Sequence, residues 1–90
     1  MASDPINAKN ARRIWSGYPD TRKIVLHLLQ LGWRIVPSGR HNYRARCPEG
    51  YPLRGHGVAI SKTPQNDGRH ARRVSDETLG RCPDRHDLMR

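Results

Sequence analysis

A histidine flanked by arginines is the group of residues in this sequence best suited to chemistry. His41 follows Arg40 directly, and Arg44 and Arg46 come three and five residues later. A histidine titrates near neutral pH and can move a proton, while arginine binds phosphate through paired hydrogen bonds. RNA supplies its own nucleophile, the 2′-hydroxyl, so its cleavage needs only proton transfer and cations that stabilise charge on the phosphate. The cluster therefore predicts RNA binding, with His41 as general acid or base.

The net charge of the chain favours a polyanion as its partner. Seventeen Lys and Arg against eight Asp and Glu give a formal net charge of +9, and most of the basic residues are arginines. So strong an excess repels itself unless a polyanion compensates it, whereas a solubilising surface usually mixes both signs. The excess lies in residues 9–73, while residues 74–90 are close to neutral. We therefore expect the body of the chain to contact nucleic acid.

The segment around His41 resembles the HicA family, which consists of small ribonuclease toxins of bacterial toxin–antitoxin pairs. That family has a helix, then Gly-Trp, a strand, a turn with Gly and Ser, a histidine, and a strand with an aromatic and a basic residue. The matching positions here are Gly32, Trp33, Ser38, Gly39, His41, Tyr43 and Arg44, and the resemblance spans about residues 21–81. It implies an α-β-β-β-α fold related to double-stranded RNA-binding domains, catalysis by His41, single-stranded or messenger RNA as substrate, and an acidic antitoxin protein as partner.

The elements that must position these residues follow from the apolar pattern. Asp20 is the expected N-cap of a first helix, and Gly32 closes it. Turn residues separate three short strands from one another and from a second helix. The expected ranges are 21–31 for the first helix, 33–36, 41–47 and 58–60 for the strands, and about 65–81 for the second helix. We predict an α+β fold, with a three-stranded antiparallel sheet and both helices on one face.

Alternation along the strands predicts where the arginines lie. Arg44 and Arg46 share one face of the second strand and, with Arg34, are expected on or at the rim of the sheet face that no helix covers. His41 has the parity of Tyr43, which is expected to face the helices. His41 therefore reaches the arginines only if it lies at the very start of its strand.

Residues 1–20 leave two alternatives open. Asp4 and Pro5 could start a short extra helix that runs to about Ile14, or the segment could be a basic arm that orders on binding. The domain is expected over residues 21–82, with a tail over 83–90. A homodimer stays open if the N-terminal segment packs across a neighbour.

Other candidate residues carry weaker signals. The basic residues of the second helix and the turn before it either extend the phosphate footprint or form a solvated face: Lys62, Arg69, Arg72 and Arg73. Cys47 and Cys82 lack the spacing of a zinc site and are expected to be reduced core residues, without metal or cofactor. His27 is expected to pack partly buried in the first helix. Without a secretion signal or an apolar run that could span a membrane, we expect a cytoplasmic protein.

Three functions remain consistent with the sequence. The first is a metal-independent endoribonuclease of a toxin–antitoxin pair, which uses His41. The second is a non-catalytic module of the same fold that binds RNA or DNA, as small basic proteins of bacteria and phages do. The third is a protein whose basic face docks an acidic protein partner. A steep salt dependence of nucleic-acid affinity would speak against the third.

Overall fold

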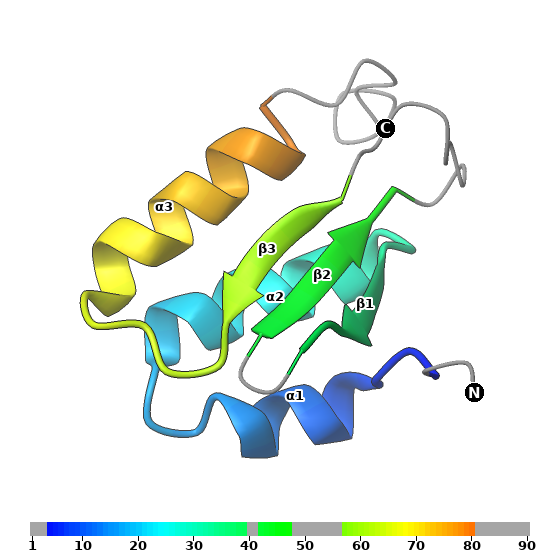
Figure 1. Cartoon of the computed structure of the whole chain (residues 1–90), viewed down its shortest axis with the longest axis horizontal. Helices are drawn as coiled ribbons and strands as arrows, with labels where there is room; N and C mark the ends of the chain where they lie inside the picture. The colour runs from blue at the N-terminus through cyan, green and yellow to red at the C-terminus, as the bar shows by residue number, and fades with distance from the viewer. Residues whose placement is uncertain (1–3, 40–41, 48–56, 81–90) are drawn as a thin grey trace.

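The computed structural model describes residues 4–39, 42–47 and 57–80. In these residues it shows an α+β fold, with three helices and one antiparallel sheet of three strands (Figure 1). In chain order the elements are α1 (Ala8–Ile14), α2 (Pro19–Gln30), β1 (Arg34–Pro37), β2 (Asn42–Arg46), β3 (Val58–Ser61) and α3 (Asp67–Thr78). The strands are neighbours in that same order, β1-β2-β3. In Figure 1 the sheet faces the viewer, with α2 behind it and α3 beside the β3 edge. The predicted fold class is confirmed.

The N-terminal segment forms a helix, which was one of its two expected states. The helix begins later than the Asp4-Pro5 signal suggested, because Asn7 and Asn10 form a reciprocal capping box. Ala11 and Trp15, four residues apart, are both fully buried in the common core. The ring of Trp15 meets that of Tyr43 edge to face, with centroids 5.1 Å apart. Residues 8–15 therefore pack as part of the same core as the sheet.

The cap of α2 differs from the expected one. Asp20 lies inside the first turn, and the N-cap residue is Tyr18, whose side chain makes no capping bond. The first N–H groups of a helix have no partner within it. Here the carboxylate of Asp67, at the start of α3, accepts from the N–H groups of Asp20 at 2.7 Å and Thr21 at 2.8 Å. Burial alone would raise the pKa of Asp67, but the Thr21 side chain and these two N–H groups hold it below its usual value.

The core lies between the sheet and the helices. Side chains from both layers are fully buried there: Val25, Leu28, Ile35, Ala45, Ile60 and Val74. Trp33 is only 2% exposed, as its alternation with Ile35 predicted. Because a strand's side chains alternate between faces, the burial of Ile35, Ala45 and Ile60 fixes which residues point the other way.

Several boundaries and one side chain differ from expectation. β2 begins at Asn42, β3 continues to Ser61, and α3 ends at Thr78, a few residues before the expected end. The hydroxyl of Thr78 donates to the carbonyl of Val74 at 2.7 Å within that last turn. His27 is exposed, because it lies on the stripe of Lys23 rather than on the core face of α2. Cys82, expected at the end of α3, lies outside the described residues.

Candidate nucleic-acid interface

The register of the sheet gathers three arginines on its open face. Arg34 of β1 stands directly opposite Arg46 of β2, and Arg44 stands opposite Val36. Ile35 and Ala45 point into the core, so the arginines between them point away from the helices. Arg34 and Arg46 are exposed, and Arg44 is half-buried. This placement is the one that alternation predicted.

The open face carries positive charge that no acidic side chain among its described residues balances. Like charges directly opposite each other on neighbouring strands destabilise a sheet. The described residues that share this face with the arginines carry no carboxylate, being Val36, Asn42, Gly57, Ala59 and Ser61. Repulsion between Arg34 and Arg46 is thus not relieved by an acidic neighbour within this part of the sheet.

Gly57 lets one of these arginines lie against the sheet. A Cβ atom on Gly57 would come within 2.6 Å of Nη1 and 2.7 Å of Cδ of Arg44. The stem of Arg44 therefore passes over the backbone just before β3, and this explains why Arg44 is half-buried although it faces outward. The sequence showed Gly57 only as one of several glycines in a loop, so its role was missed.

The predicted proton-transfer residue and its neighbour lie outside the described part of the chain. In the sequence, Arg40 and His41 stand between Gly39 and the first residue of β2, Asn42. Asn42 pairs with Ser61 across the sheet, so it has the same parity as the arginines. Because His41 is not among the described residues, its assignment as the catalytic residue stays a prediction.

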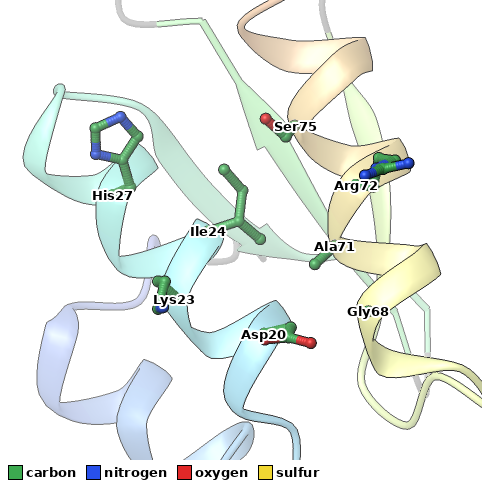
Figure 2. A pocket seen from close by; sticks show the side chains of 8 residues that line it. All are labelled: Asp20, Lys23, Ile24, His27, Gly68, Ala71, Arg72 and Ser75. Atoms are coloured by element: carbon green, nitrogen blue, oxygen red, sulfur yellow. The ribbon is translucent and has the colours of Figure 1, made fainter.

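The predicted basic residues beyond β3 lie on α3 and on the segment before it rather than on the strands. Lys62, Arg69, Arg72 and Arg73 are all exposed. Arg73 is already engaged, since its guanidinium donates to Glu77 at 3.1 Å and to the carbonyl of Ala59 at 3.3 Å. Arg72 lines a groove between α3 and α2, with the strands behind it in Figure 2. Arg72 therefore lies on a different surface from the open-face arginines.

Side chains of α3 and of Trp15, the C-cap residue of α1, form hydrogen bonds with the outer edge of β3. The carbonyl of Ser61 accepts from the indole N–H of Trp15 at 2.9 Å, and its N–H donates to Nε2 of His70 at 3.0 Å. Arg73 contacts the neighbouring outward carbonyl, that of Ala59. Edge strands otherwise present such groups to other chains. No local pattern reveals the bond of Trp15, because Trp15 and Ser61 are 46 residues apart.

The bond to Ser61 fixes the charge state of His70. A ring nitrogen accepts a hydrogen bond only when it carries no proton, so this bond requires the neutral imidazole. Burial and the nearby Arg73 lower the pKa of His70, against the opposing effects of Asp67 and Glu77. His70 therefore serves the sheet edge as an acceptor rather than adding positive charge to α3.

The described ranges also bear on metal binding and on membrane insertion. There, no group of three or more His, Cys, Asp or Glu side chains is placed to hold a metal ion. Cys47 is 1% exposed in the core, and Cys82 is not among the residues described. None of the helices in this part of the chain has the length and apolar character to cross a membrane.

Comparisons of the chain with protein-family models, with curated proteins and with solved structures find no match. The resemblance to the HicA family therefore rests on the sequence motif alone.

Proposed function

We propose that this chain binds RNA through the open face of its sheet. One observation carries the proposal: Arg34 stands opposite Arg46, with Arg44 on the same face and no carboxylate among the described residues there. Such an arrangement costs stability in the free protein. A phosphate backbone relieves that cost when it binds, because it brings one negative charge per nucleotide to the cations.

The spacing of the arginines favours a polymer over a single small anion. Residues two apart on a strand lie roughly 7 Å from each other, and neighbouring strands are about 4.8 Å apart. Arg44 and Arg46 are related by the first spacing, and Arg34 and Arg46 by the second. Guanidinium groups so arranged on an open surface meet successive phosphates, each through two parallel hydrogen bonds. The face therefore recognises backbone rather than base sequence.

RNA cleavage by His41 extends this proposal, and it is supported by the position of His41 next to β2 in the chain and by the resemblance to HicA. His41 takes the proton of a 2′-hydroxyl, whose oxygen then attacks the adjacent phosphorus. The bond from phosphorus to the 5′-oxygen breaks, and the leaving oxygen takes a proton from imidazolium or water. The products are a 2′,3′-cyclic phosphate and a 5′-hydroxyl. The resemblance further points to messenger RNA in the cytoplasm, and to an acidic antitoxin as restraint.

The binding proposal is tested by salt dependence. We expect Arg44→Ala with Arg46→Ala to weaken binding to all RNA sequences alike, and to flatten the plot of log affinity against log salt by about two units. Lys9→Ala with Arg13→Ala removes two exposed cations from α1 and serves as the matched control. Fluorescence anisotropy with labelled RNA measures both. Equal losses in the two double variants would contradict the proposal.

Cleavage is tested with the purified chain, a long RNA and a DNA of the same sequence, in the presence of a chelator. We expect RNA alone to be cut, because DNA lacks the 2′-hydroxyl. His41→Ala should lower the rate by about a hundred- to ten-thousand-fold while RNA affinity stays nearly unchanged. If the wild-type chain binds RNA without cutting it, the non-catalytic binding module is the correct function. Equal cleavage of DNA would contradict this mechanism.

A further inference from the structure

A groove with a small-residue wall runs between α2 and α3, on the side of the helices that faces away from the sheet (Figure 2). Ile24 of α2 lies on its floor, half-buried, and Ala71 of α3 faces it. Gly68 and Ser75 lie one turn before and after Ala71 on the same wall. A side chain at Gly68 would meet only a carboxylate oxygen of Asp20, at 3.2 Å. The small residues on α3 thus leave room for apolar side chains from another molecule.

Positive side chains border this apolar floor from both helices. The cations are Lys23 on the α2 side and Arg72 on the α3 side, and the imidazole ring of His27 lies one turn after Lys23; all three side chains are exposed. Asp20 is the one carboxylate among the lining residues, and it lies at the N-terminal end of α2. The groove therefore combines an apolar centre with a rim that carries two cations, one on each helix, against one carboxylate at its end.

We propose that this groove binds an amphipathic helix of an acidic protein partner. Apolar side chains on one face of that helix pack on Ile24 and Ala71, while flanking carboxylates pair with Lys23 and Arg72. Helices commonly dock in grooves in this way, through apolar anchors three and four residues apart. The proposal is independent of RNA binding, since the strands lie behind both helices when the groove faces the viewer (Figure 2) and the open face of the sheet is the one turned away from α2 (Figure 1).

The chemistry of the groove distinguishes this occupant from two others. A phosphate backbone would pair with Lys23 and Arg72 but gain nothing from the half-buried Ile24 between them. A second copy of this chain would bring together two molecules of formal charge +9, with cations facing cations. An acidic amphipathic helix can pack apolar side chains on the floor of the groove and pair its carboxylates with the cations of the rim.

The test uses the full chain and two synthetic helical peptides of 18 residues. The first has leucines three and four positions apart on one face, with flanking glutamates. The second has serine in place of each leucine and the same charge. We expect the leucine peptide to bind at least ten-fold more tightly, and to shift the amide signals of Ile24, Ala71 and Ser75 in ¹⁵N NMR spectra. Lys23→Glu with Arg72→Glu should weaken binding at least ten-fold.

The controls distinguish binding of the peptide in the groove from general attraction between an acidic peptide and a basic protein. Lys9→Glu with Arg13→Glu changes the net charge equally on α1, and should have less than a three-fold effect on the leucine peptide. Three results would overturn the proposal: equal binding of the two peptides, equal weakening by the two double reversals, or shifts confined to other surfaces. A short RNA duplex that shifts the groove signals and displaces the peptide would make the groove a nucleic-acid site instead.

Discussion

Two groups of cationic residues in this molecule differ in what already contacts them. On the open face, Arg34 and Arg46 stand opposite each other, with no acidic residue on the described part of that face. At the β3 edge, Arg73 bonds Glu77 and the carbonyl of Ala59, and His70 accepts from Ser61. Within the described part of the chain the first group has no acidic neighbour on its face, whereas the second group already contributes hydrogen bonds to the fold. A net charge of +9 alone does not separate them.

The largest expected effect tests whether the side chains that contact the β3 edge stabilise the fold. Trp15→Ala removes a fully buried aromatic side chain and leaves the carbonyl of Ser61 without its indole partner. We expect a loss of about 3–5 kcal/mol in the free energy of unfolding, because a large core cavity replaces the ring. Urea denaturation measures it, with Trp15→Phe as the variant that keeps most of the packing. A loss under about 1 kcal/mol for Trp15→Ala would show that α1 contributes little to the core.

The next effect contrasts one arginine from each group. Arg73→Ala loses its bonds to Glu77 and Ala59 and should cost about 1 kcal/mol. Arg34→Ala relieves repulsion with Arg46 and should leave stability unchanged within about 0.5 kcal/mol, or raise it slightly. Thermal and urea unfolding of the two variants provide the comparison. A larger loss of stability in Arg34→Ala than in Arg73→Ala would contradict the distinction between the two groups of cations.

A smaller effect appears in the pH dependence of stability. The pKa of His70 is lowered in the folded chain, so below about pH 6.5 the unfolded chain binds its proton first. The contribution of His70 to stability is therefore complete above that pH, decreases as the pH falls towards the lowered pKa, and then levels off. His70→Gln keeps an acceptor for Ser61 but does not titrate. Urea unfolding between pH 5 and 7.5 should show a weaker pH dependence in that variant, and identical profiles would refute this role.

Much of the fold could be predicted from the sequence, because its signals are local. Alternation around Trp33 and Ile35, and again around Ala45, gave the strands and the face on which Arg44 lies. The long-range contacts could not be predicted. Asp67 caps α2 across 46 and 47 residues of chain, a role that local spacing gave to Asp20. The division of the basic residues between two surfaces likewise depends on how α3 packs on α2, which no sequence pattern specifies.

The smallest effect concerns how Arg44 is held on the open face. Gly57→Ala places a methyl group where the stem of Arg44 now lies, so that side chain must move away from the sheet. We expect RNA affinity to fall a few-fold in the wild-type background, and not to change when Arg44 is already alanine. A double-mutant cycle of binding constants measures this coupling. Equal losses in both backgrounds would mean that Gly57 acts on the loop rather than on Arg44.

We propose that RNA contacts the open face of the sheet rather than the exposed cations of α3 and the segment before it. Two triple variants test it, each removing three positive charges: Arg34→Ala, Arg44→Ala and Arg46→Ala in one, and Lys62→Ala, Arg69→Ala and Arg72→Ala in the other. The measurement is the slope of log RNA affinity against log salt. We expect the first triple variant to flatten the slope by about two to three units and the second by less than about one. A slope that flattens equally in both, or more in the second, would contradict it.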